Sequence, residues 1–203
     1  MHVHDEIELK WAVDAAGHAA LAKHLGNLLG APKHLDQANC FFDTPDRRLR
    51  QARMNLRLRH ENGRVLMTCK RRAQETAAGL SHHHEWEDWV DGALWDATPD
   101  AAWLRALPLP EPILTVLGDQ PVEALGGFSN HRLEYHHQRA GIAELLCLDC
   151  TTFGARFDHE LEIETTDAPG TAAFWRAQLA DWKIAWHPQP LTKFARFLHL
   201  VGG

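Results

Sequence analysis

Charged and apolar residues alternate in several short segments of this chain. The segments Glu6–Lys10 (EIELK) and Glu160–Glu164 (ELEIE) carry rows of carboxylates, whereas 55–59 (NLRLR) carries cations in the same arrangement. Because residues i, i+2 and i+4 of a β-strand share one face, each segment predicts a strand with one charged and one apolar face. Carboxylate oxygens are ligands for divalent cations, and Arg and Lys bind phosphate. The sequence therefore predicts metal and phosphate chemistry.

The three glutamates of the 160–164 segment need compensating charge. Two like charges about 4 Å apart repel by roughly 4 kcal/mol at an effective dielectric near 20. Cations on neighbouring strands or bound divalent metals could compensate them, and the two can coexist. For any single segment, a sheet with its charged face in water is the alternative. If the sheet instead closes with its charged faces inward, the barrel gains an acidic row for metal and a basic row for phosphates.

The composition favours one soluble domain with a small anionic partner. The chain has 203 residues, of which 45% are hydrophobic and 24% are charged, and this balance excludes wholesale disorder. The net charge is −6, yet ten of the 21 Lys and Arg residues lie between Arg47 and Arg72, opposed only by Glu61. An acidic protein is a poor general binder of nucleic acid. We expect a single domain over residues 1–203 with no nucleic-acid partner.

The sequence contains no segment typical of membrane insertion or export. No stretch approaches about 20 consecutive apolar residues, and the N-terminus lacks an apolar signal core. We therefore expect a cytoplasmic protein without a membrane partner. Its four cysteines are expected to be reduced thiols.

Periodicity and turn signals predict a mixture of antiparallel strands and helices. Asn62-Gly63 is a strong hairpin signal, and Asp14 is typical of a helix N-cap. A proline-rich loop is expected at about 108–112. Strands are expected at about 3–12, 38–42, 55–59, 65–70, 85–90, 128–137, 142–150 and 156–165, and helices at about 14–30, 98–107, 169–182 and 191–200.

Ordered motifs along nearly the whole chain resemble the CYTH domains, also called triphosphate tunnel metalloenzymes. Glu6–Lys10 resembles the family signature E-x-E-x-K. Further matching blocks are 41–45 (FFDTP), 56–59 (LRLR), 67–70 (MTCK), 79–80 (GL) before 85–87 (EWE), 148–149 (LD), 160–164 (ELEIE) and 192–196 (TKFAR). The chain is most similar to the bacterial inorganic triphosphatase branch, without its C-terminal CHAD domain. The resemblance implies an α+β fold with an antiparallel, closed β-barrel, a charged lumen and helices packed outside.

The resemblance also implies roles for individual residues. Glu6, Glu8, Lys10 and Lys70 would be catalytic. The implied ligands of Mg²⁺ or Mn²⁺ are Glu6, Glu8, Asp149, Glu160, Glu162 and Glu164. The implied triphosphate-binding residues are Lys10, Arg57, Arg59, Lys70, Arg132, Lys193, Arg196 and His83. Glu85 and Glu87 match the central acidic pair of the family.

His83 marks a departure from the family pattern. Related triphosphatases carry an Arg shortly before the EWE block, whereas this chain has Ser81 followed by three histidines. With a reference pKa near 6.5, a histidine there would make substrate affinity fall as pH rises. The alternative is that the three histidines face solvent at the start of a strand.

The resemblance implies metal-dependent hydrolysis of inorganic triphosphate to pyrophosphate and phosphate. Phosphoryl transfer rests on positioning and charge stabilisation, so no covalent nucleophile is needed. The proton of the attacking water would pass to a carboxylate or a Lys. The alternatives are other activities of the family, namely thiamine, nucleoside or RNA triphosphatase and class IV adenylyl cyclase, or a non-catalytic module that binds polyphosphate or nucleotide. The sequence leaves the oligomeric state, monomer or homodimer, open.

Overall fold

The computed structural model describes residues 1–73, 79–96 and 101–201. Within these ranges the chain divides into two compact units. Unit 1 comprises the described residues of Met1–Asp5, Gln37–Gln74 and His83–Ser129. Unit 2 comprises those of Glu6–Asp36, Glu75–His82 and Asn130–Gly203.

The strands form one sheet in the order β5-β4-β3-β2-β6-β7-β8-β1-β9, and an additional pairing of β5 with β1 closes it. The strands are β1 (His2–Val13), β2 (Lys33–Asp43), β3 (Met54–Glu61), β4 (Arg64–Arg72), β5 (Leu80–Val90), β6 (Glu123–Arg139), β7 (Ile142–Phe153), β8 (Arg156–Thr165) and β9 (His187–Pro188). The helices are α1 (Ala15–Leu29), α2 (Arg48–Gln51), α3 (Ala93–Asp96), a 3-10 helix η1 (Ala101–Ala106), α4 (Glu111–Leu117), α5 (Ala168–Asp181) and α6 (Lys193–Leu200). The prediction of an α+β fold with a closed antiparallel barrel is confirmed.

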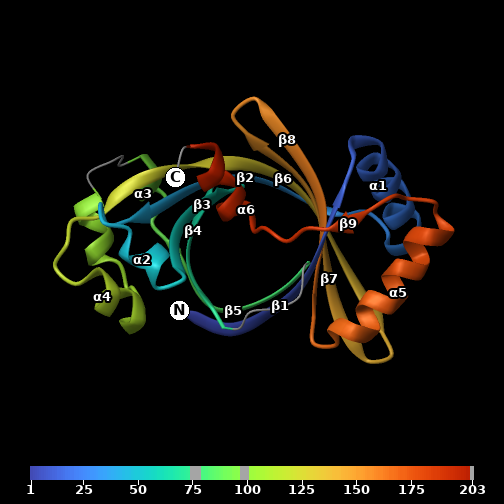
Figure 1. Ribbon diagram of the computed structural model, residues 1–203, viewed down its shortest axis with the longest axis horizontal. Helices are drawn as coiled ribbons and strands as arrows, with labels where there is room; N and C mark the ends of the chain where they lie inside the picture. Colours follow the sequence, from blue (N-terminus) through green and yellow to red (C-terminus); the bar gives the residue numbers. More distant parts are fainter. Residues whose placement is uncertain (74–78, 97–100, 202–203) are drawn as a thin grey trace. The chain divides into compact units, whose positions relative to one another are not determined.

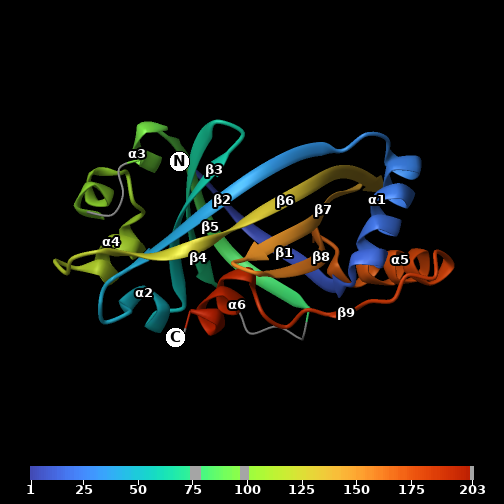
Figure 2. The ribbon, with the colours of Figure 1, turned by 90° about the horizontal axis from the view of Figure 1, so that it is seen from above.

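In unit 2, helices α1 and α5 lie side by side against the apolar side of β1, β7 and β8 (Figures 1 and 2). The core between them includes Trp11, Leu161, Ile163 and Trp175, each buried. Since Leu161 and Ile163 alternate with glutamates along β8, their burial directs the glutamates to the opposite face. The two faces expected from the sequence are thus present.

Unit 1 has a second apolar core, formed by one face of β3 and β4 with α2, η1 and α4 (Figure 1). Leu56, Leu58 and Met67 are fully or almost fully buried in it, together with Leu104 of η1 and Ile113 of α4. Arg57 and Arg59 alternate with the two leucines and therefore belong to the other face of β3. The same alternation thus separates charged from apolar residues in both units.

Most expected elements are present, and the turn chemistry agrees with the sequence. Asp14 caps α1 by accepting a 2.6 Å hydrogen bond from the Gly17 amide. Asn62 and Gly63 join β3 to β4 with φ angles of 47° and 83°, the left-handed conformation that a tight hairpin requires. The strand and helix positions were predicted to within a few residues in these segments.

Two of the expected elements differ from the structure. The proline-rich segment is only partly a loop, because α4 begins at Glu111 with Pro112 in its first turn, where a missing amide hydrogen has no cost. The helix expected at 98–107 is the short η1 from Ala101, and its expected start at Thr98-Pro99 lies outside the described residues. Among the described helices, none is long and apolar enough to cross a membrane.

Candidate active site

Three buried carboxylates converge on the charged face of unit 2. Asp149 of β7 lies directly opposite Glu160 of β8 in the strand register, and Glu162 follows two residues later on the same face. One carboxylate oxygen from each lies within 4.8 Å of the others. Their exposed fractions are 0%, 1% and 7%, so water cannot screen their mutual repulsion. We name these three residues the acidic cluster.

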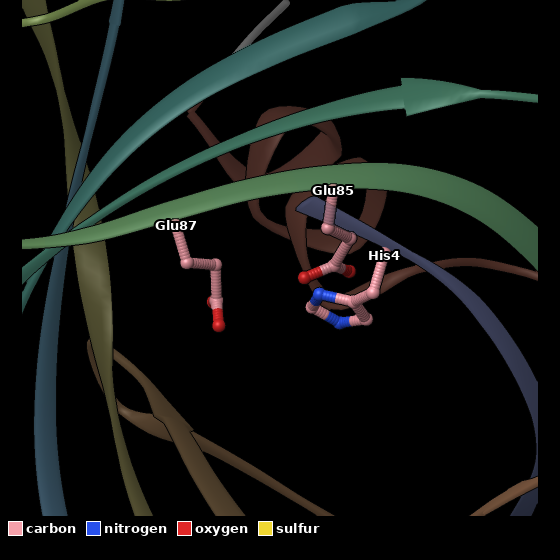
Figure 3. A group of neighbouring side chains, drawn as sticks. All are labelled: His4, Glu85 and Glu87. Atoms are coloured by element: carbon pink, nitrogen blue, oxygen red, sulfur yellow. The ribbon is translucent and has the colours of Figure 1, made fainter. Parts of the chain in front are cut away.

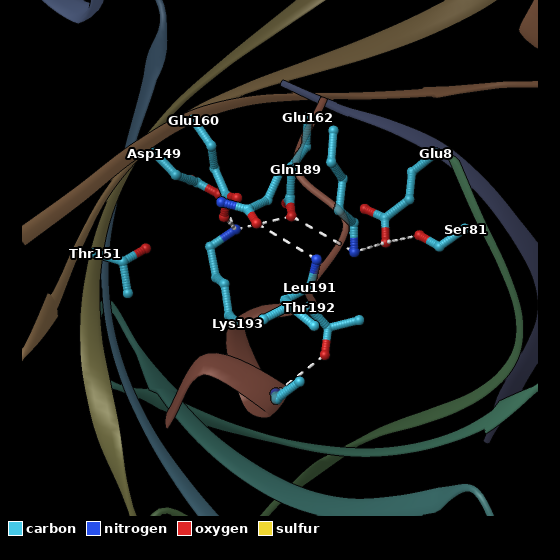
Figure 4. A network of polar contacts seen from close by, with 12 residues as sticks. Glu8, Ser81, Asp149, Thr151, Glu160, Glu162, Gln189, Leu191, Thr192 and Lys193 are labelled. Carbon is cyan, nitrogen blue, oxygen red and sulfur yellow. Dashed lines mark hydrogen bonds and ion pairs between the residues drawn. The ribbon is translucent and has the colours of Figure 1, made fainter. Parts of the chain in front are cut away.

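Lys193 extends its side chain into the acidic cluster (Figure 4). Its Nζ lies 2.7 Å from Oδ2 of Asp149 and 2.8 Å from Oε1 of Glu162, and it also forms an ion pair with Glu160. One ammonium group therefore serves all three carboxylates.

The segment before α6 explains how Lys193 reaches this position. β9 pairs with β1, with Pro188 opposite Trp11, and the amide of Gln189 donates to the carbonyl of Lys10 at 2.9 Å. Thr192 then caps α6 by accepting a hydrogen bond from the Ala195 amide. The pairing with β1 thus sets the start of α6, where Lys193 is the first helical residue.

Two arginines complete the compensation of the acidic cluster. Arg132 of β6 donates through Nε and Nη2 to the two oxygens of Asp149, at 2.8 and 2.7 Å, and through Nη2 to Glu162 at 2.7 Å. Arg196 of α6 donates to Glu160 at 3.0 Å. Three cations therefore match three carboxylates.

The E-x-E-x-K segment of β1 contributes its charged residues to the same charged face of unit 2 as the acidic cluster. Lys10 Nζ is 2.5 Å from Oε1 of Glu8 and 3.9 Å from Oε1 of Glu162, and Ser81 Oγ donates to Glu8 at 2.9 Å. Glu6, two residues before Glu8, is 8% exposed and contributes to the electrostatic environment of Lys10. Strand alternation thus brings Lys10 next to both a carboxylate of its own strand and the acidic cluster.

Mutual compensation keeps these groups charged. Burial alone would raise the pKa of Glu162, but the charges of Lys193 and Lys10 outweigh it and hold this pKa at about 2. Arg132 and Lys193 likewise hold the pKa of Asp149 well below its usual range despite complete burial. Burial would lower the pKa of Lys193, but Asp149, Glu160 and Glu162 raise it above its ordinary value. Asp149, Glu162 and Lys193 are therefore ionised at neutral pH.

The charged face of unit 1 carries the predicted cations of β3 and β4. Arg57 donates to Thr68 Oγ1 at 3.0 Å, and Arg59 donates to Asn39 Oδ1 at 3.2 Å. Lys70 lies opposite Glu85 in the β4–β5 register and forms an ion pair with it. Arg57 is 8% exposed although it is a cation, which indicates a site built to hold it.

Glu87 and Glu85 point from β5 to the charged face of unit 1, near His4 (Figure 3). Glu87 accepts a hydrogen bond from Thr68 Oγ1 at 3.1 Å. His83, on the same face of β5, is 8% exposed, whereas His84 is exposed and its Nδ1 contacts the carboxylate of Asp5. The alternative of three solvent-facing histidines is therefore wrong for His83.

The structure brings some of the predicted metal ligands together and separates others. Asp149, Glu160 and Glu162 form one cluster, while Glu164 lies further along β8, opposite Glu8 of β1. The predicted phosphate-binding residues Lys10, Arg132, Lys193 and Arg196 all contact carboxylates of unit 2. The predicted residues Arg57, Arg59 and Lys70 share the charged face of unit 1.

Sequence reasoning missed several polar residues of these faces. Asn130 donates to Asp149 at 3.0 Å and accepts from Thr151 at 2.8 Å, and Ser81 and Thr68 hold Glu8 and Glu87. The sequence indicates these residues only by their positions. Each lies on the charged face of its strand, either two residues from a predicted site residue or opposite one on the neighbouring strand. Short polar residues are too common in strands for that signal to be read alone.

Comparison with known proteins agrees with this geometry. The CYTH domain family model matches residues 4–197. The chain belongs to the CYTH domain family. This match includes both charged faces and the segment that carries Lys193 and Arg196.

Solved structures of CYTH-like proteins are similar over almost the whole chain. HpAC1 from Hippeastrum, described as having a dominant triphosphatase activity, is 26% identical with a TM-score of 0.84, and the match covers 96% of this chain and 95% of that one. A protein of Bacillus halodurans described as an adenylate cyclase is 25% identical with a TM-score of 0.71, covering 97% and 99%. PH1819 from Pyrococcus horikoshii, 16% identical with a TM-score of 0.60 over 96% and 99%, shares the fold.

Proposed function

We propose that this CYTH domain, acting as a single domain over residues 1–203, hydrolyses inorganic triphosphate to pyrophosphate and phosphate with Mg²⁺ or Mn²⁺ as cofactor. The observation that carries the proposal is the acidic cluster, in which three buried carboxylates are matched by Lys193, Arg132 and Arg196. The dominant triphosphatase activity described for HpAC1 supports the reaction class.

Charge balance explains why a metal triphosphate complex suits this site. Separating Lys193 and Arg132 from buried carboxylates would leave charges of both signs unpaired, which is costly. A divalent cation can replace the ammonium at the carboxylates, and a polyphosphate can replace the carboxylates at the cations. Binding both together therefore exchanges one set of charge pairs for another.

The acidic cluster fits a hard divalent cation, because its donors are all carboxylate oxygens within 4.8 Å of one another. In the proposal, Asp149, Glu160 and Glu162 hold this cation, with Glu6, Glu8 and Glu164 of the same face as further ligands. A cation bound there would supply Lewis-acid polarisation of the phosphate oxygens.

The basic residues would bind and orient the triphosphate. Burial would lower the pKa of Lys10 and Lys193, but neighbouring carboxylates outweigh it and raise the pKa of each, so both are cations at neutral pH before substrate binds. The remaining phosphate-binding residues in the proposal are Arg57, Arg59, Lys70, Arg132, Arg196 and His83. Arginine forks bind phosphate oxygens in pairs and fix their orientation.

In the reaction, water oxygen bonds to the terminal phosphorus, and the bond from that phosphorus to its bridging oxygen breaks. The pyrophosphate leaves with its new negative charge facing the cations. In the proposal, the proton of the water passes to a carboxylate or a Lys of the charged face. Glu6 and Glu8, with Lys10 and Lys70 as charge-stabilising groups, are the proposed catalytic residues.

A binding module that recognises polyphosphate without turnover is the alternative from another class. Such a module needs the cations, whereas the three buried carboxylates would weaken anion binding unless a metal joined them. Thiamine, nucleoside and RNA triphosphates and cyclase activity are alternatives within the family.

The proposal is tested by phosphate release from inorganic triphosphate with Mg²⁺, with Mn²⁺ and with EDTA, beside ATP, thiamine triphosphate and pyrophosphate. The variant is Glu8→Gln, and the matched control is Glu123→Gln, which removes a carboxylate from a surface ion pair with Arg47. We expect metal-dependent release from inorganic triphosphate that falls at least 100-fold in Glu8→Gln and less than twofold in the control. Preference for an organic triphosphate would overturn the substrate, and tight binding without turnover would favour the binding module.

A further inference from the structure

The imidazole of His4 lies beside the carboxylates of Glu85 and Glu87 on the charged face of unit 1 (Figure 3). One ligand atom each of His4, Glu85 and Glu87 lies within 4.8 Å of the others. We propose that these three residues form a binding site for a first-row transition-metal dication such as Zn²⁺ or Co²⁺, separate in ligand chemistry from the all-carboxylate cluster of unit 2. The proposal does not depend on the proposed hydrolysis.

Strand pairing sets the position of His4. The N-terminal amine of Met1 lies 3.1 Å from Asp88 Oδ2, and the carboxylate of Asp5 contacts His84 Nδ1. β1 pairs with β5, and residue numbers rise along β1 as those of their partners fall along β5. His4, next to Asp5, therefore lies near Glu85, next to His84. Because Glu87 lies two residues beyond Glu85, both carboxylates share the face that His4 occupies. The geometry is thus held by backbone pairing and does not require a mobile loop.

The imidazole of His4 has an unused ligand atom. Among the described residues, Nδ1 of His4 is buried without a hydrogen-bond partner, a state that costs free energy unless another group satisfies it. A metal ion is one such group, since neutral imidazole is a common metal ligand. Glu85 also forms an ion pair with Lys70, but a carboxylate has two oxygens and can serve both partners.

Donor type predicts which metal each cluster prefers. Sites made only of carboxylates suit Mg²⁺, Ca²⁺ and Mn²⁺, whereas imidazole raises affinity for Zn²⁺, Co²⁺ and Ni²⁺. Asp149, Glu160 and Glu162 offer oxygen alone, while His4 adds nitrogen to Glu85 and Glu87. Excess Mg²⁺ should therefore saturate the first cluster and leave the second available to Co²⁺.

The test is a titration of the full chain with Co²⁺ in excess Mg²⁺, followed by the ligand-field absorption of Co²⁺ and by calorimetry. Variants are His4→Ala, His4→Gln and Glu87→Gln, each checked for folding by circular dichroism. The matched control is His2→Ala, because His2 is exposed and stacks on His4 with ring centroids 5.1 Å apart. Asp149→Asn tests the acidic cluster of unit 2.

We expect one Co²⁺ ion to bind in excess Mg²⁺, with affinity reduced about tenfold or more in the three His4 and Glu87 variants. His2→Ala and Asp149→Asn should change it by less than about twofold. Unchanged affinity in folded His4→Ala, equal loss in His2→Ala, or loss in Asp149→Asn would each overturn the assignment. Absence of Co²⁺ binding in excess Mg²⁺ would also overturn it.

Discussion

Nζ of Lys193 lies 2.7 Å from Oδ2 of Asp149, a carboxylate with no exposed surface. Lys193 thereby provides the positive charge that a divalent cation would bring to the acidic cluster. In the proposed function, a metal ion bound at the acidic cluster would displace this ammonium group, and the displaced group would become available to an anion. The two ligands should therefore bind cooperatively.

Replacing Lys193 should separate the two binding events. In Lys193→Met we expect Mg²⁺ or Mn²⁺ to bind about tenfold or more tightly without triphosphate, because an internal competitor is gone. Triphosphate affinity should fall by a similar factor. Calorimetry of each ligand alone measures both effects.

The control for this variant is Lys33→Met, whose side chain is 60% exposed and lies 3.6 Å from Glu134. It should leave both affinities within about twofold. Weaker metal binding in Lys193→Met would contradict the view that the ammonium group competes with metal. Metal-free Lys193→Met should also unfold more easily, by about 3–5 kcal/mol, because buried carboxylates lose their partner.

Arg57 should contribute to substrate binding from unit 1. A charge-assisted hydrogen bond contributes about 1.5–3 kcal/mol, so Arg57→Ala should raise the KM for triphosphate about 10–100-fold. Arg64→Ala is the control, since its exposed guanidinium packs over the Trp89 ring at 3.8 Å. An equal rise of KM in both variants would indicate a general effect of net charge and contradict a specific role.

A buried carboxylate outside the charged faces should control the docking of α5. Glu144 of β7 is 2% exposed. It accepts hydrogen bonds from two residues of α5, Thr171 at 2.7 Å and Trp175 Nε1 at 2.8 Å. It also contacts His137 Nδ1 at 2.9 Å and Arg139 Nε at 3.1 Å. Burial would raise the pKa of Glu144, but these hydrogen bonds lower it overall. The folded state therefore favours the carboxylate.

The sign of the resulting pH dependence follows from that lowered pKa. The stabilisation is fully present above the unfolded pKa of about 4.3 and is lost as pH falls through the lower folded pKa. Glu144→Gln should reduce the free energy of unfolding at neutral pH by about 2–4 kcal/mol and flatten its dependence below pH 5. Urea unfolding followed by tryptophan fluorescence measures this, with Glu123→Gln as the control. An unchanged free energy of unfolding at neutral pH would show that the hydrogen bonds of Glu144 make no net contribution to stability.

Two glycines should respond oppositely to alanine. A Cβ at Gly127 of β6 would lie 1.6 Å from the Asn39 carbonyl oxygen of β2, so Gly127→Ala must move backbone and should cost at least about 2 kcal/mol. A Cβ at Gly26 within α1 meets nothing within 4 Å, so Gly26→Ala should stabilise by about 0.5–1 kcal/mol. Thermal unfolding of both variants provides the comparison, and destabilisation by Gly26→Ala would contradict it.

Local patterns in the sequence were enough to predict eight of the strands, their two faces and the turn residues, although β9 was not predicted. Alternation in 160–164 predicts which residues are apolar and which are charged, and Asp14 and Asn62-Gly63 act within their own turns. The motif order also predicted the family, which the match over residues 4–197 confirms.

Which charges meet depends on the packing of the whole fold. Lys193 is 44 residues from Asp149 in the chain, and only the pairing of β9 with β1 and the start of α6 bring it into the acidic cluster. His4 and Glu85 are separated by 81 residues and come together through the pairing of β1 with β5. Local patterns cannot specify such contacts, because strand order and register depend on how whole faces pack.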